Sequence, residues 1–491
     1  MRGSQRDHSR MPARMRPAPE PVASVQPAMS RRARITALIV ACALFMENLD
    51  STVVATALPA MAHSFHANPV HMSVALTSYM LSLSVFIPAS GWFADRFGSR
   101  RVFCTAIVVF TLGSVLCGRA DTLWFLVLAR VFQGIGGAMM VPVGRLVLLR
   151  TVAKSELVAA MAWLSMPALL GPVLGPPVGG FIVTYVSWHW IFDINVPIGV
   201  LGVVLVLLYI EEFRGSEATP FDLLGLFLTA TSLVLLLFGL EMASRGVLPW
   251  PESTAMLLVG AAAGLAYWFH AQSREYPLVD LGLMRIPTFG LSVAAASFFR
   301  IGIGAVPFLL PLLLQVGFGE TAVESGMITF ASSAGALVMK PAAQYALRMF
   351  GFRATLIWNG TISVITIALM AGFRPAWPLA AIYAVLLAGG FFRSLQFTAY
   401  NSIAFADIPP AKLSAATSFY STAQRLSLTA GIAAGAAALE IFSKLFGHQS
   451  PSLADYSFAF LTVAVVALAS VPVSMRLAAD AGAELSGQPA R

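Results

Sequence analysis

The stretch "GPVLGPPVGG", Gly171–Gly180, lies inside an apolar run and contains three prolines and four glycines. These residues destabilise helices in water, but a bilayer helix tolerates them because neighbouring helices, side chains and waters satisfy the freed backbone groups. Gly171, Gly175 and Gly179 recur every four residues, so they form a flat stripe that a second helix can approach closely. We therefore expect a membrane-spanning helix with a hinge and a tight packing seam.

The composition extends this expectation to the whole chain. The 491 residues are 58% hydrophobic and only 11% charged, whereas soluble domains contain about 25% charged residues. Apolar runs of about 20 residues, the length that crosses a bilayer, recur along the chain. We predict an all-α polytopic membrane protein with fourteen spans, at 35–58, 72–94, 102–118, 121–147, 157–184, 191–210, 222–242, 253–271, 289–315, 324–346, 354–373, 377–403, 413–439 and 456–475.

The basic residues indicate the orientation of these spans. Of the 31 Lys and Arg residues, 22 fall on the side of the amino terminus and 4 on the other side. The positive-inside rule therefore places both termini in the cytoplasm. We expect the spans to cross a cell (inner) membrane. Residues 1–34 form a basic leader that we expect to be disordered. A cleaved signal is the competing interpretation, but the following apolar run contains Glu47 and Asp50.

Two short segments resemble each other. "RFGSR" at 96–100 lies between spans two and three, and "MFGFR" at 349–353 lies between spans ten and eleven. This shift of eight spans predicts two six-helix halves, at 35–210 and 289–475, with two extra helices inserted at 211–288 and a cytoplasmic tail at 476–491. Repeated halves with a site between them are typical of secondary transporters.

Other functional classes lack their sequence signals. There is no P-loop for ATP, no acid/base or nucleophile motif of an enzyme, and no soluble domain of a sensor. The scattered basic residues do not indicate nucleic-acid binding. Cys42, Cys104 and Cys117 lie in apolar runs, and we expect no metal and no cofactor other than the proton. The first outer loop contains His63, His66 and His71. These histidines either bind a metal or belong to a solvated loop, and the sequence does not decide between the two.

Charged residues within the spans need a function or a partner, because burial in the bilayer is costly. Glu47 and Asp50 are three residues apart on one helix face. Burial and mutual repulsion disfavour their ionisation, which suits proton coupling; a wet helix end or a pairing cation is the alternative. Arg130 is the candidate partner of Asp50, either as a switch or as a fixed structural pair. Gln133 shares its face and would contact substrate or a neighbouring backbone.

The second half carries cations instead of acids. Arg300 and Arg393 are candidates for the substrate cavity, whereas Lys340 is expected to extend to the membrane interface. The amides Gln315, Gln396, Gln424 and Asn401 would line the same cavity or join neighbouring helices. Acids on one side and arginines on the other do not predict a simple cationic substrate. Elsewhere, His189 and Asp193 are four residues apart, so their side chains could form a pH-responsive pair or only cap a helix end.

Several motifs resemble those of the major facilitator superfamily. "GWFADRFGSRRV" is similar to its loop signature, which implies a cytoplasmic gate formed by Gly91, Asp95, Arg96, Gly98, Arg100 and Arg101. "LARVFQGIGGA" resembles its fourth-span motif, which implies a role for Arg130 in proton transfer. "GPVLGPPVGG" resembles its fifth-span antiporter signature, with Gly171, Pro172, Gly175, Pro176, Gly179 and Gly180.

Further segments resemble the fourteen-span drug:proton antiporter branch. They are "LDSTVVATALP" from Leu49, "SWHWIFDINVPIG" from Ser187 and "GGFFRSLQFTAYN" from Gly389. His189 and Asp193 depart from the usual residues of the second motif, which affects the substrate more than the fold.

The resemblance implies proton-coupled export of amphiphilic drugs by alternating access, with Asp50 as the main proton carrier and Glu47 as an auxiliary acid. Export or proton symport of one metabolite is the alternative, and a non-transporting sensor is a third. The expected partners are a small-molecule substrate, protons and the lipid bilayer. Whether accessory proteins of an export complex are also partners stays open.

Overall fold

The structure is a computed structural model that describes residues 29–65, 69–214, 220–245, 249–448 and 451–486. Within these ranges the chain forms helices and no strand. Eleven of the described segments are long and apolar enough to cross a membrane. The predicted spans 72–94, 157–184 and 324–346 are outside that set but are also helical. The all-helical architecture is therefore confirmed, and the total of fourteen spans stays a prediction.

The first half runs from the amino-terminal helix to residue 209. It consists of α1 (Arg31–Ser64), α2 (Pro69–Phe86), η1 (Ile87–Ala89), α3 (Ser90–Phe97), α4 (Ser99–Gly118), α5 (Leu123–Thr151), η2 (Lys154–Glu156), α6 (Leu157–Tyr185), α7 (Trp190–Asp193) and α8 (Asn195–Tyr209). The first helix begins at Arg31, four residues before the predicted span. The Ser30 hydroxyl accepts from the Ala33 backbone N–H and caps it.

Two helices, α9 (Leu223–Arg245) and α10 (Trp250–Gln272), separate the halves in the sequence. They pack on each other, and α9 also contacts α2 and α17. The second half consists of η3 (Leu281–Arg285), α11 (Pro287–Gly304), α12 (Val306–Leu312), the π-helix η4 (Leu313–Gly317), α13 (Ala322–Met339), η5 (Lys340–Ala342), α14 (Ala343–Phe350), α15 (Phe352–Met370), α16 (Leu379–Ile403), η6 (Pro410–Lys412), α17 (Leu413–Leu445), α18 (Leu453–Leu468), α19 (Ser470–Ser474) and a short α20 (Ala483–Ser486).

The two halves repeat the same helix pairings. In the first half α1 packs on α6, α5 packs on α2 and α4, and α8 packs on α1 and α4. In the second half α11 packs on α17, α16 packs on α13 and α15, and α18 packs on α11 and α15. Each helix thus has a counterpart in the other half, which agrees with the predicted internal repeat.

The resembling segments have a shared backbone geometry. Gly98 follows α3 with a φ of 95°, and Gly351 follows α14 with a φ of 76°. Positive φ values in this range favour glycine, because a Cβ atom is strained there. At both places a broken helix turns sharply into the next one. This turn gives a physical reason for the Phe-Gly-x-Arg pattern to occur twice.

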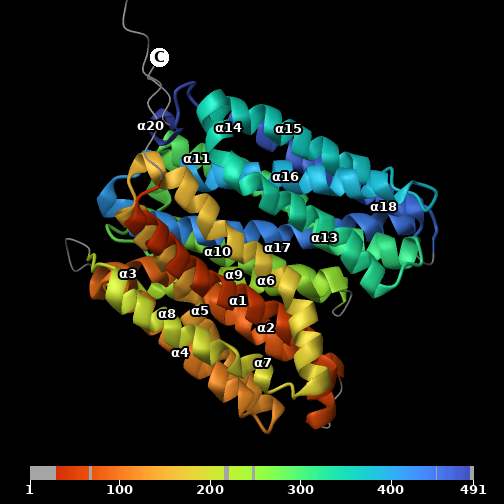
Figure 1. Cartoon of the computed structure of the whole chain (residues 1–491), viewed down its shortest axis with the longest axis horizontal. Coiled ribbons are helices and arrows are strands. Elements are labelled where there is room, and N and C mark those ends of the chain that lie inside the picture. Colours follow the sequence, from red (N-terminus) through yellow and green to blue (C-terminus); the bar gives the residue numbers. More distant parts are fainter. Residues whose placement is uncertain (1–28, 66–68, 215–219, 246–248, 449–450, 487–491) are drawn as a thin grey trace, which may run out of the picture.

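The halves meet most closely at one end of the molecule, which we call the gate end. It contains α3, α14, α20 and the first turns of α17, and there α17 contacts η1, α3 and α5 while α6 contacts α14. In Figure 1 the helices of the first half (red to yellow) and second half (teal to blue) lie close at the gate end on the left and diverge to the right. The two halves are therefore in contact at one end of the molecule and separate toward the other.

Candidate functional site

A buried network surrounds Asp50 inside the first half. Arg130 Nη1 on α5 lies 2.7 Å from Asp50 Oδ2, and both side chains are inaccessible to solvent. Gln133 Nε2 and Asn195 Nδ2 donate to Asp50 Oδ1 at 2.9 and 3.1 Å. The Ser114 hydroxyl accepts from the same two amides. Four helices, α1, α4, α5 and α8, therefore converge on one carboxylate.

This network satisfies the ionised form of Asp50. Charge-assisted bonds to a guanidinium and to amide donors are the strong hydrogen bonds of a protein interior. Arg130 also donates Nε to the Ala75 carbonyl at 3.3 Å and lies 4.4 Å from the Tyr79 ring. The predicted pairing of Arg130 with Asp50 is thus present in the structure. Gln133, expected in the substrate cavity, is fully buried in this network instead, because its face of α5 points into the first half.

Glu47 has a different environment, one turn earlier on α1. Its Oε2 atom is buried without a hydrogen-bond partner. The charged groups that act on Glu47 are Arg425 of α17 and Asp50. Arg425 itself contacts the Met80 sulfur of α2, so this arginine of the second half reaches the first half. Glu47 therefore faces the boundary between the halves, whereas Asp50 is enclosed within one of them.

The gate end is closed around Asp95. Its Oδ1 atom accepts from the Ser414 hydroxyl of α17 at 2.5 Å and from Arg150 Nη2 at 3.2 Å. The same Arg150 nitrogen donates to Ser414 Oγ at 3.0 Å. A Cβ atom on Gly91 would lie 2.7 Å from the Ser414 carbonyl, so only glycine permits this approach. Asp95 and Gly91 thus join the halves as the loop motif implied, with Arg150 as an additional partner.

The arginines of the same loop have another partner. Arg101 Nε lies 3.3 Å from Glu212 Oε2, and the Arg100 backbone N–H donates to Glu212 Oε1. A Cβ atom on Gly98 would lie 2.1 Å from Glu212 Oε1. Arg96 is exposed. Arg100 and Arg101 therefore attach the loop to α8 and the residues that follow it, and Asp95 pairs with Arg150 instead of with these arginines.

The glycine stripe of α6 packs against α1, as the sequence predicts. A Cβ atom on Gly171 would lie 2.7 Å from Asn48 Cβ, and one on Gly175 would lie 2.1 Å from Thr52 Oγ1. Thr52 Oγ1 also donates to the Gly171 carbonyl at 3.3 Å. Gly180 has no atom within 4 Å of its Cβ position. The side chains of Pro172 and Pro176 lie outside the described residues, and α6 is continuous through the motif.

Arg300 of the second half lies at the boundary between the halves. It is 1% exposed, and its Nη2 donates to Tyr420 Oη at 2.5 Å and to Asn401 Oδ1 at 3.2 Å. Arg145 of α5 approaches the same tyrosine from the first half, with its guanidinium carbon 5.2 Å from the ring. The sequence interpretation counted Arg145 only among the basic residues around the end of the predicted span 121–147 and did not identify Tyr420. No sequence signal distinguishes this arginine from its neighbours near the end of α5.

The other candidates of the second half are separate from Arg300. Gln396 is buried and bonded to Asn359, so it joins two helices instead of lining a cavity. Arg393 donates to Ser332, and the exposed Gln315 donates to Ser325 near the opposite end. Lys340 is 5% exposed and donates to Thr398, which corrects its expected extension to the interface.

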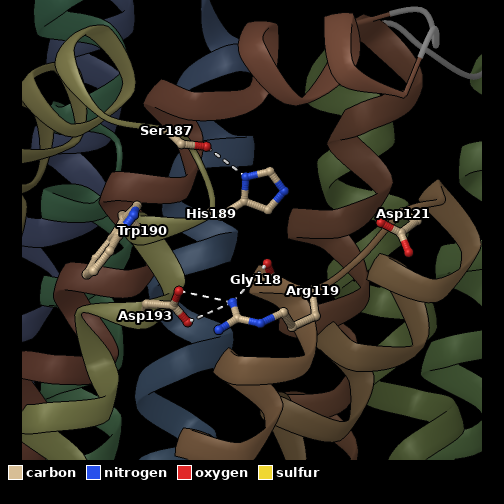
Figure 2. Close-up of a pocket in the computed structure, with 7 residues that line it drawn as sticks. All are labelled: Gly118, Arg119, Asp121, Ser187, His189, Trp190 and Asp193. Carbon is tan, nitrogen blue, oxygen red and sulfur yellow. Dashed lines mark hydrogen bonds and ion pairs between the residues drawn. The ribbon is translucent and has the colours of Figure 1, made fainter.

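A pocket of about 630 Å³ lies at the end opposite the gate. Figure 2 shows Asp193 paired with Arg119 at 3.1 Å and His189 bonded to the Ser187 hydroxyl at 2.7 Å. The predicted His189–Asp193 pair is therefore wrong, because each residue has another partner. Burial and then the nearby Arg119 lower the pKa of His189. Among the described residues no three His, Cys, Asp or Glu form a metal cluster, and His66 lies outside them.

The repeated halves, the closed gate end and the buried charge pair define a membrane transporter built on two related bundles. The family model "Major Facilitator Superfamily" matches residues 40–306, and the chain belongs to this superfamily.

In sequence, the chain is similar to the "Putative multidrug resistance protein MdtD" of Salmonella newport (strain SL254) and of Salmonella agona (strain SL483). Each is 37% identical over 440 residues, covering 88% of this chain and 92% of the relative.

Solved structures share the fold. The human organic anion transporter MFSD10 (TETRAN) superposes with a TM-score of 0.66 at 14% identity, covering 90% of this chain and 99% of that one. A double-tryptophan mutant of XylE gives 0.65 at 14% identity, covering 92% and 98%. At this identity the likeness concerns the fold alone. The family match and the all-helical fold confirm the polytopic transporter predicted from the sequence.

Proposed function

We propose that this protein is a proton-coupled antiporter that exports amphiphilic small molecules from the cytoplasm by alternating access. The observation that carries the proposal is the enclosed pair of Asp50 and Arg130. The Asp50 carboxylate accepts hydrogen bonds from one guanidinium and two amides. Protonation removes its negative charge and so weakens the strongest bond of the network, the one to Arg130.

The position of this pair links it to the gate. Arg130 and Arg150 lie on the same helix, α5, and Arg150 contacts Asp95 and Ser414 at the gate end. Protonation of Asp50 would release Arg130 and allow α5 to shift relative to α1. Because a helix moves as a rigid element, that shift would reach Arg150 and open the gate. Deprotonation would restore the closed arrangement.

The charge distribution supports the direction of transport. The positive-inside rule places the termini and the Asp95 loop in the cytoplasm, so the gate end faces inward and this conformation is closed to the cytoplasm. As the two ends open alternately, export of the substrate is coupled to protons that enter the cytoplasm down their gradient. The MdtD relatives, whose name refers to multidrug resistance, support amphiphilic substrates.

The test uses inverted membrane vesicles that contain the protein. An imposed proton gradient is expected to drive accumulation of 2-naphthalenesulfonate, 2-naphthylmethylammonium or both. Asp50→Asn removes the titratable group with little change of shape and is expected to abolish this accumulation while the protein stays folded. Glu440→Gln, which changes an exposed carboxylate paired with Lys444, is the matched control. Unchanged gradient-driven transport in Asp50→Asn would refute the assignment of the proton carrier.

A further inference from the structure

Two buried arginines from opposite halves have no part in the Asp50 network. Arg145 of α5 is 5% exposed, and Arg300 of α11 is 1% exposed. Their guanidinium carbons lie 5.2 and 4.7 Å from the ring centre of the same residue, Tyr420. Two like charges beside the same tyrosine repel each other, so this arrangement is costly unless something offsets it.

The guanidinium groups have unused donors. Arg145 donates to the Ser421 hydroxyl and the Gln424 amide oxygen, both at 3.3 Å, but its Nε has no partner. Arg300 donates through Nη2 alone, and its Nε and Nη1 are buried without partners. Buried N–H groups of a charged side chain are normally all bonded, because each unsatisfied one costs free energy.

No acid neutralises this pair within the described part of the chain. Neither Arg145 nor Arg300 forms an ion pair there, whereas Arg130, Arg150 and Arg101 each have a carboxylate partner. The charged and titratable groups acting on Arg145 are Tyr420 and Arg300. The acceptors around both guanidiniums are neutral: two hydroxyls and two amides.

We propose that Arg145 and Arg300 form an anion-binding site for the acid group of a transported substrate. A carboxylate, sulfonate or phosphonate has two or three oxygens that match the fork of N–H donors on a guanidinium. Because one arginine comes from each half, an anion between them would be released or enclosed as the halves move. This inference rests on the proposed transport function and specifies its substrate class as amphiphilic organic anions.

The surroundings also indicate what accompanies the acid group. The centre of the Phe397 ring lies 5.7 Å from the Arg300 guanidinium carbon, and the Phe299 ring meets the Phe397 ring edge to face, with the ring centres 5.9 Å apart. An aromatic surface beside two cations suits a substrate with an apolar or aromatic body and one acid group.

The experiment measures binding to the full-length protein in detergent, without a proton gradient. The probes are inorganic sulfate, which makes no demand on shape, and 2-naphthalenesulfonate; the neutral 2-naphthalenesulfonamide has the same ring system. At constant ionic strength, both anions are expected to raise the thermal unfolding temperature of the protein, and the sulfonamide is not. The dissociation constant comes from the concentration dependence of this rise.

Arg300→Gln and Arg145→Gln are expected to weaken binding of 2-naphthalenesulfonate about tenfold or more each. Arg300→Lys and Arg145→Lys keep the charge and should retain part of the affinity, which separates loss of the site from misfolding. Arg274→Gln, in an exposed loop position after α10, is the matched control and should bind like the original protein.

The outcomes distinguish the site from the transport function. The proposal is overturned if neither anion stabilises the protein, if the sulfonamide binds equally well, or if the glutamine variants keep their affinity. Anion binding without any proton-driven transport would support the site and refute the proposed function. Proton-driven transport, together with glutamine variants that keep their affinity for 2-naphthalenesulfonate, would support the proposed function and refute the anion site.

Discussion

At the scale of single residues, the two carboxylates of α1 have opposite surroundings although they are three positions apart. Asp50 accepts bonds from Arg130, Gln133 and Asn195 inside one half. Glu47 has an unpartnered oxygen and acts across the boundary on Arg425. A proton on Asp50 therefore changes the packing within a half, whereas a charge on Glu47 is placed to influence how the halves approach each other.

Removal of Arg130 tests how strongly the pair holds the first half together. Arg130→Gln leaves the Asp50 carboxylate buried without its cation, which costs about 3–5 kcal/mol in comparable buried pairs. We expect a thermal unfolding temperature lower by several degrees in detergent. The double variant Asp50→Asn with Arg130→Gln should recover part of this loss, because no buried charge is left. Additive losses in the double variant would contradict the coupling of the two residues.

At the scale of helices, the seam between α1 and α6 explains why the proline- and glycine-rich stretch is compatible with a continuous helix. Gly171 and Gly175 bring α6 against Asn48 and Thr52 of α1. Asp50 lies on α1 between these two contact residues. The seam therefore supports the helix segment that carries the charge pair, and its close contact ties α6 to any movement of α1.

A bulky residue in this seam is expected to separate the two helices. Gly175→Leu places a Cβ atom 2.1 Å from Thr52 Oγ1, so α1 or α6 must shift. We expect locked or uncoupled transport in inverted vesicles and a lower unfolding temperature. Gly180→Leu is the matched control on the same helix, because no atom lies within 4 Å of its Cβ position. Full coupled transport in Gly175→Leu would show that the seam has no role in the transport cycle.

At the scale of the whole molecule, the halves meet where α6 contacts α13, α14 and α16 and along the first turns of α17. Ser414 contacts Asp95, Ser418 donates to the Ile87 and Pro88 carbonyls, and Ser421 accepts from Arg145. These serines let α17 approach the first half closely and supply its bonds. In the proposed transport cycle, separation of the halves at the gate end would break these bonds together.

Loss of Arg150 is expected to shift this balance toward the open gate. A hydrogen bond to a charged group contributes about 1.5–3 kcal/mol, so Arg150→Gln should raise the open population about tenfold. The measurement is maleimide labelling of Ser418→Cys in inverted vesicles, with Cys42, Cys104 and Cys117 replaced by Ala. Ser418 is 1% exposed in the closed gate. Equal labelling rates with Arg150 present and with Arg150→Gln would contradict this account.

Much of the architecture follows from local chemistry. Apolar runs of bilayer length require helices, because a lipid interior leaves backbone groups no other partner. The repeated Phe-Gly-x-Arg pattern corresponds to two turns with positive φ at Gly98 and Gly351. The glycine stripe predicted a close seam, and the isolated charges Asp50 and Arg130 predicted each other, since pairing with an opposite charge offsets the cost of burying one.

Other features depend on which helices become neighbours. Helical spacing predicts that Gln133 shares a face with Arg130, but only the packing of α4 and α8 directs it to Asp50 instead of a cavity. The partners of Arg101 and Asp193 are Glu212 and Arg119, both distant in the sequence. In the sequence Arg145 is one of the basic residues around the end of a predicted span, and the approach of α17 makes it a buried residue near Arg300. Periodicity specifies the direction of a side chain relative to its own helix, whereas its neighbours depend on contacts between residues far apart in the chain.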